Sequence, residues 1–69
     1  MRVEQSRLLN VLDEIDGWVP LFALEDDPYL HPNDDLFVPS LVARGWVDHD
    51  ALRGVVRVNE AGRAAFERL

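Results

Sequence analysis

The sequence predicts a small α+β domain in which helices in the first half are followed by a β-hairpin and a closing helix. Three observations lead to this prediction. Apolar residues in the first half recur at helical spacing, Gly45 stands where a helix would end, and the β-branched run Val55–Val58 precedes Asn59, a residue type that caps helices. Because the chain has only 69 residues, we assign all of it, residues 1–69, to one domain.

A first helix is predicted over residues 3–16, with Ser6 as a candidate N-cap and Gly17 just beyond its end. Polar residues fall on one side of this helix, which should face solvent. The apolar residues recur at i, i+3, i+4 and i+7 and should form one buried face: Leu8, Val11, Leu12 and Ile15.

A short second helix is predicted over residues 20–26, because Pro20 suits the first position of a helix. The pair before it, Trp18 and Val19, should be extended. The next segment, residues 26–35, contains two prolines and is therefore predicted to be a loop. This loop is also rich in acidic residues: Asp26, Asp27, Asp34 and Asp35.

A third helix is predicted over residues 35–44, with Asp34 or Asp35 as its N-cap. Pro39 allows an alternative, in which residues 36–38 are extended and the helix starts at Pro39 itself. The segment carries more apolar residues than one buried stripe requires: Leu36, Phe37, Val38, Leu41 and Val42.

The hairpin should pair a strand that begins at Trp46 with the strand Val55–Val58, through a seven-residue loop over residues 48–54. Alternation places Val55 and Arg57 toward solvent and three valines toward the core: Val47, Val56 and Val58. A last helix over residues 60–69 should then cover the core with one apolar side. That side comprises Ala61, Ala65, Phe66 and Leu69.

The order of elements over residues 36–69 resembles the second half of a winged helix-turn-helix domain. The ending VRVNEAGRAAFERL, in which Asn59 precedes Gly62 by three positions, is similar to the strand, cap and helix that close many such regulators. The resemblance implies a small winged helix with three helices, a two- or three-stranded β-wing and a C-terminal helix. For a DNA-binding member it implies a third helix in the major groove and a wing that contacts a neighbouring phosphate or the minor groove. The corresponding nucleic-acid contacts would be Ser40, Arg44, Arg53 and Arg57.

The charge of the chain disfavours DNA as the partner. Thirteen acidic residues against seven basic ones, all arginine, give a net charge of -6. Nucleic-acid affinity depends on cations that displace phosphate counterions, so an acidic domain is repelled unless its arginines cluster. An equally good interpretation is that the wing arginines pair with Asp48 and Asp50, and that Arg44 neutralises a helix C-terminus.

The apolar excess favours a different function. We expect a non-enzymatic binding module that mediates protein–protein interaction or self-association as a homodimer, through the third helix and large aromatic residues. The candidate interface residues are Trp18, Phe22, Phe37 and Trp46. A further alternative is an acidic inhibitor that mimics a nucleic acid. Its acidic surface would consist of Asp26, Asp27, Asp34 and Asp35.

Other classes of function find little support in the sequence. His31 and His49 lie in predicted loops without a spaced partner, so we expect no metal site. We expect no catalytic residues, no cofactor and no small-molecule substrate, because neither a nucleophile–base set nor a phosphate-binding glycine loop is present. Without a signal-peptide pattern or an apolar run of about 20 residues, the expected location is the cytoplasm, with no membrane contact.

Overall fold

The computed structural model describes residues 1–67 and confirms the predicted fold class. Within these residues, four α-helices, a 3₁₀ turn and a three-stranded antiparallel sheet form a small winged-helix-like α+β domain. The elements are α1 (Val3–Ile15), β1 (Val19–Pro20), α2 (Leu21–Glu25), η1 (Asp34–Phe37), α3 (Val38–Ala43), β2 (Val47–Asp50), β3 (Val55–Val58) and α4 (Glu60–Glu67).

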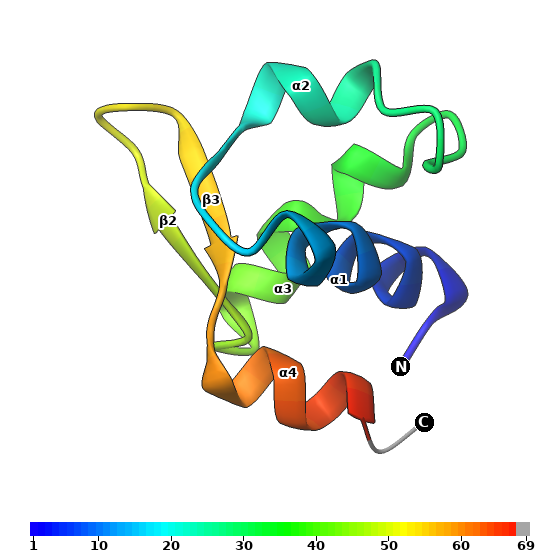
Figure 1. Cartoon of the computed structure of the whole chain (residues 1–69), viewed down its shortest axis with the longest axis vertical. Coiled ribbons are helices and arrows are strands. Elements are labelled where there is room, and N and C mark those ends of the chain that lie inside the picture. Colours follow the sequence, from blue (N-terminus) through cyan, green and yellow to red (C-terminus); the bar gives the residue numbers. More distant parts are fainter. Residues whose placement is uncertain (68–69) are drawn as a thin grey trace.

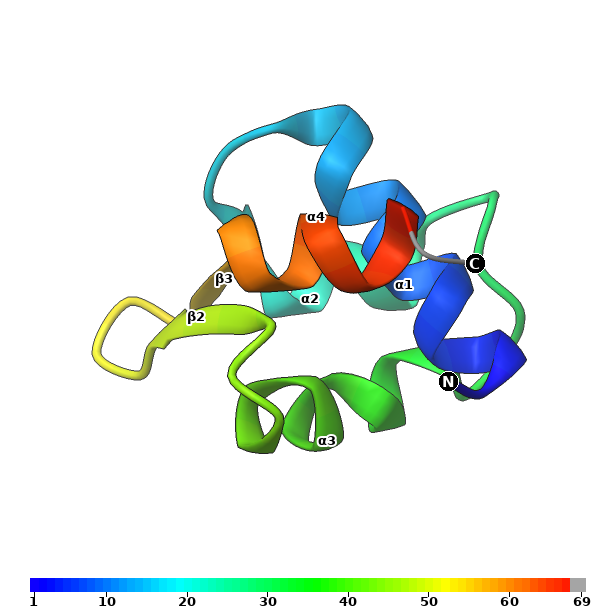
Figure 2. The ribbon, with the colours of Figure 1, turned by 90° about the horizontal axis from the view of Figure 1, so that it is seen from below.

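Helix α1 lies in the middle of the domain, with the sheet beside it, α2 above it and α4 below it (Figure 1). Seen from below, α4 crosses in front of α1, and α3 lies on the other side of β2 (Figure 2). Three leucines of α1 are completely buried: Leu8, Leu9 and Leu12. Each such burial stabilises the fold by about 1.5–3 kcal/mol. This helix is therefore the element on which the others pack.

The first helix begins at Val3 as predicted and ends at Ile15, one residue earlier than predicted. Arg2 is the N-cap instead of Ser6, and the backbone N–H of Arg2 donates to the Gln5 side chain at 2.9 Å. Leu8, Val11 and Leu12 are buried as predicted, but Ile15 is 50% exposed. Leu9 is buried instead, because α1 is covered by η1 and α3 as well as by β3 and α4. The buried face is therefore wider than a single i, i+3, i+4 stripe.

The sheet has the order β1-β3-β2, and its core-facing valines are those predicted. Val47 pairs with Val58, Val19 pairs with Val56, and all four are buried. The predicted loop length was wrong, since β2 continues to Asp50 and the loop contains only residues 51–54. The polarity of β2 misled the prediction. Its acidic side chains lie on the outer face of a paired strand.

The third predicted helix consists of two elements. The 3₁₀ turn η1 comes first, and α3 begins at Val38, so neither residue 35 nor residue 39 is its start. Pro39 lacks an N–H and cannot form the α-helical bond to the carbonyl of residue 35, which accounts for the break. The second helix is also shorter than predicted, because Pro20 belongs to β1 and pairs with Val55.

The predicted cap of the last helix is confirmed. The Oδ1 atom of Asn59 accepts the N–H of Gly62 at 2.9 Å, and its Nδ2 donates to the Gly45 carbonyl at 2.8 Å and to Asp48 at 3.2 Å. Asn59 thus joins the start of α4 to the start of β2. Of the apolar side predicted for this helix, Ala65 and Phe66 are half-buried, Ala61 is exposed, and Leu69 lies outside the described residues.

Replacing Asn59 by alanine is expected to lower the free energy of unfolding by about 1–2 kcal/mol. The backbone N–H of Gly62, in the first turn of α4, and the Gly45 carbonyl would both lose a hydrogen-bond partner. Urea unfolding followed by tryptophan fluorescence measures this change. Asn10→Ala is the matched control, since Asn10 is exposed on α1 and should tolerate alanine without loss. Equal losses in both variants would contradict the capping role.

Candidate functional site

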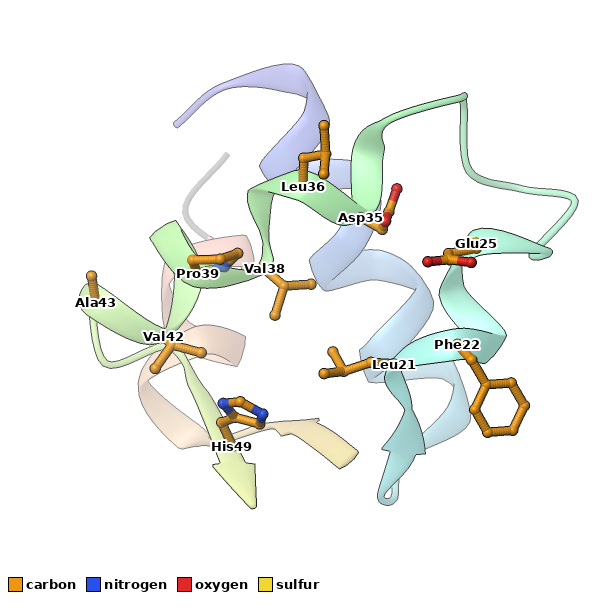
Figure 3. A pocket seen from close by; sticks show the side chains of 10 residues that line it. All are labelled: Leu21, Phe22, Glu25, Asp35, Leu36, Val38, Pro39, Val42, Ala43 and His49. Carbon is orange, nitrogen blue, oxygen red and sulfur yellow. The ribbon is translucent and has the colours of Figure 1, made fainter. Parts of the chain in front are cut away.

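An apolar groove of about 660 Å³ lies between α2 on one side and η1 with α3 on the other (Figure 3). All of its lining residues except one belong to these three short helices, and the exception, His49, comes from β2. The lining comprises Leu21, Phe22, Glu25, Asp35, Leu36, Val38, Pro39, Val42, Ala43 and His49. Most of these lining residues are apolar.

The groove exists because its helices are too short to bury all their apolar side chains. Helix α2 buries only Leu24, so Leu21 is half-buried and Phe22 remains 72% exposed. On the opposite wall α3 buries one side, and Leu36 of η1 is 68% exposed. Leu21 and Val38 point into the groove, whereas Phe22 and Leu36 lie at its outer edges with their side chains directed away from its middle (Figure 3).

The two ends of the groove differ in charge. Glu25 and Asp35 lie at one end, and His49 lies at the other (Figure 3). Within residues 1–67, neither carboxylate forms an ion pair or accepts a side-chain hydrogen bond. Behind this end, a second and more polar depression of about 410 Å³ shares the same two carboxylates. Glu25 and Asp35 thus border two hollows.

Both predicted interface tryptophans lie outside the groove and are covered by arginines. Trp18 is 39% exposed, and the guanidinium of Arg57 lies 4.6 Å from its ring centroid. Trp46 is half-buried against the core, with the Arg44 guanidinium 5.0 Å from its ring. These contacts have cation–π geometry, so one face of each tryptophan ring is covered by an arginine.

The two predicted interface phenylalanines are also separated. Phe37 is half-buried against the core, and Arg2 lies 5.5 Å from its ring centroid. Phe22 is the member of the predicted interface set that lines the groove. The four aromatic residues are therefore not brought together. The apolar surface combines Phe22 with members of the apolar excess noted for the third helix, Leu36, Val38 and Val42, and with Leu21, which was not predicted to take part.

The wing arginines form the ion pairs considered above as the alternative to DNA contacts. Arg57 pairs with Asp48 at 3.2 Å, and Arg53 pairs with Asp50 at 3.7 Å. Hydrogen bonds from Asn59 and then from Arg57 lower the pKa of Asp48, so this carboxylate stays charged and holds its arginine. The positive charge of the wing is thus largely neutralised within the hairpin.

The remaining predicted nucleic-acid contacts lie on or near α3. The Ser40 hydroxyl donates to the Phe37 carbonyl at 2.7 Å and accepts a hydrogen bond from the Gln5 side chain at 3.0 Å, so it is engaged inside the fold. Arg44 is exposed and has no carboxylate partner within the described part of the chain. Its partner there is the ring of Trp46.

The predicted acidic surface is not a single patch, and the inclusion of Asp34 was wrong. Asp34 is 1% exposed and accepts two hydrogen bonds from Arg7, at 2.7 and 2.8 Å, and one from the His31 N–H at 2.8 Å. The Arg7 bond lowers the pKa of Asp34 despite the opposing effect of burial. Asp27 accepts a bond from the Tyr29 N–H, Asp26 is exposed, and Asp35 faces the groove.

Among residues 1–67, no three His, Cys, Asp or Glu side chains converge on a point where a metal ion would be held. None of the helices described has the length and apolar character needed to cross a bilayer.

Comparisons of the chain with protein-family models, with curated proteins and with solved structures give no match.

Proposed function

We propose that this chain is a non-enzymatic protein-binding module that holds a segment of another polypeptide in the groove between α2 and α3. The observation that carries the proposal is the uncovered apolar surface of this groove, with Phe22 and Leu36 mostly exposed on its two rims. Exposed apolar surface that is rimmed by polar residues is typical of interaction sites. Binding would remove these side chains from water and supply the driving force.

A separate protein is a better occupant of the groove than a second copy of this chain. Each copy carries a net charge of -6, so a symmetric dimer through this groove would bring two negatively charged domains together. Like charges at such an interface oppose association. The negative charge of the chain therefore favours a partner that is not itself acidic.

DNA binding by the third helix and wing ranks second. The wing arginines Arg53 and Arg57 already pair with Asp50 and Asp48, so contact with a phosphate would first break those pairs. Arg44 is available on α3, but one exposed arginine offers little against the overall negative charge. Mimicry of a nucleic acid ranks third, because the acidic residues expected to act together lie apart.

Synthetic amphipathic peptides of about 15 residues with a leucine face test the proposal. A series with positive, neutral and negative polar faces, titrated into the labelled protein, is expected to shift the NMR amide signals of groove residues for at least one member. Phe22→Ser and Leu36→Ser should each weaken that complex about tenfold, because each removes apolar area from the interface. Both side chains are exposed, so the variants should fold normally.

Leu52→Ser is the matched control for these variants. Leu52 is fully exposed in the hairpin loop, outside the groove, so its replacement should leave peptide affinity unchanged. Equal weakening by Leu52→Ser, or no binding by any peptide of the series, would contradict the proposal. A DNA duplex complex that weakens with salt and with Arg44→Glu would replace it with the second function.

A further inference from the structure

We infer that the segment bound in the groove is an amphipathic helix that carries a lysine or arginine at one end of its apolar face, where it meets Glu25 and Asp35. This inference rests on the proposed function and names the class of partner. It follows from three features of the groove: the charge at its two ends, the second depression behind Glu25 and Asp35, and the scarcity of polar groups along the middle of its walls.

The first feature is the pair of carboxylates. Some acidic side chains of the described residues pair with an arginine, as Asp13 and Asp16 do with Arg63, and others, such as Asp26 and Glu60, do not. Glu25 and Asp35 project to the same end of the groove and have no such partner within residues 1–67 (Figure 3). A cation placed between them would interact with two negative charges at once. The described part of the protein supplies no such cation itself.

The second feature is the space available to that cation. Beyond Glu25 and Asp35 the surface sinks into the second depression, which is lined by polar as well as apolar residues, including His31 and Asn33. A long lysine or arginine side chain could lie with its methylene groups along Leu24 and its charged group beside the carboxylates. The opposite end, at His49, has no carboxylate in its lining, so the groove itself gives the bound segment a direction.

The third feature concerns the backbone of the bound segment. The walls are side chains of α2, η1 and α3, which are mostly apolar along the middle of the groove. A segment lying there must satisfy its own N–H and C=O groups, because these walls provide few partners. A helix does so internally and presents an apolar face at i, i+3, i+4 and i+7, whereas an extended segment would leave backbone groups unpaired.

Fluorescence anisotropy with three labelled peptides tests this inference. All three share one leucine face and differ at one residue at its end, which is lysine, glutamine or glutamate. We expect the lysine peptide to bind about fivefold more tightly than the glutamine peptide and the glutamate peptide to bind most weakly. Raising the salt from about 50 to about 200 mM should reduce the difference, because partly exposed charges are screened.

The double variant Glu25→Gln with Asp35→Asn should abolish the preference for lysine, so that the lysine, glutamine and glutamate peptides bind with similar affinities. The matched control is Glu14→Gln with Glu67→Gln, which removes two exposed carboxylates outside the groove and changes the net charge equally. This control should retain the preference, because a local site and not the overall charge produces it.

Different failures separate the two proposals. If the glutamine peptide binds as tightly as the lysine peptide and Leu36→Ser weakens both, the charge inference is wrong and the protein-binding function stands. If no peptide binds, the function itself is wrong. If light scattering shows a dimer that Leu36→Ser dissociates, the occupant is a second copy of the chain, and the inference of a basic partner helix is overturned.

Discussion

Replacing Gly62 by alanine is expected to lower the free energy of unfolding by about 2 kcal/mol, although alanine is the better helix former by about 1 kcal/mol. A Cβ atom at this position would lie 2.2 Å from the carbonyl oxygen of Trp46 and 2.8 Å from a methyl group of Val58. The Trp46 carbonyl cannot move easily, because it accepts the backbone N–H of Asn59 at 3.2 Å. Helix α4 would have to move away from the hairpin.

A loss of this size is large for the domain, since a single core in so short a chain rarely supplies more than about 3–5 kcal/mol. Urea unfolding followed by the fluorescence of Trp46 and Trp18 measures it. Gly17→Ala is the matched control, because nothing lies within 4 Å of a Cβ added at Gly17. That variant should be at least as stable as the parent protein, and a stable Gly62→Ala would show that α4 is not packed against the hairpin as described.

The end of the chain could be predicted well because its signals are local. Alternating valines fix which face of β3 is buried. An asparagine just before a helical segment specifies a cap, because its side chain can accept the backbone N–H three residues later, here that of Gly62. Gly62 was noticed only as part of a resemblance. Its physical reason, the close approach of the Trp46 carbonyl, depends on a contact between α4 and the hairpin that the sequence pattern does not contain.

Elements whose form depends on distant partners were predicted less well. The extent of β2 was missed because Asp48 and Asp50 are polar, yet both positions pair with β3 and their side chains bind arginines. The third helix was predicted either in one piece or from Pro39 onward, and neither alternative included the 3₁₀ turn that precedes α3. Such errors arise where tertiary contacts or one residue's chemistry outweigh the local pattern.

The groove was predicted only in part. The sequence showed that the third helix has excess apolar residues, and Phe22, one of the expected interface aromatics, is exposed on the groove's rim. It did not show that α2 would stand opposite α3, so Leu21 and Ala43 were overlooked, as was the role of Glu25. The acidic loop contains a similar case. Asp34 looked like a surface carboxylate because its partner, Arg7, is distant in the sequence.

Replacing Asp34 by asparagine is expected to lower the free energy of unfolding by about 2–3 kcal/mol near neutral pH. The buried carboxylate accepts two bonds from Arg7 and one from the His31 N–H, and through them it attaches the segment before η1 to α1. Asparagine has the same shape but no charge, and its amide would turn a donor toward a donor. Asp26→Asn is the matched control, because Asp26 is exposed and should tolerate the change.

The dependence of this loss on pH identifies its electrostatic origin. Because the Arg7 bond holds the pKa of folded Asp34 below its ordinary value, the unfolded chain binds the proton first as the pH falls. The contribution of the carboxylate is therefore complete above about pH 4 and is lost as the pH falls through the folded pKa. The asparagine side chain of the variant does not titrate, so the unfolding free energies of parent and Asp34→Asn should converge in acid. A difference that stays constant from neutral pH down to about pH 3 would show that shape, and not charge, makes Asp34 necessary.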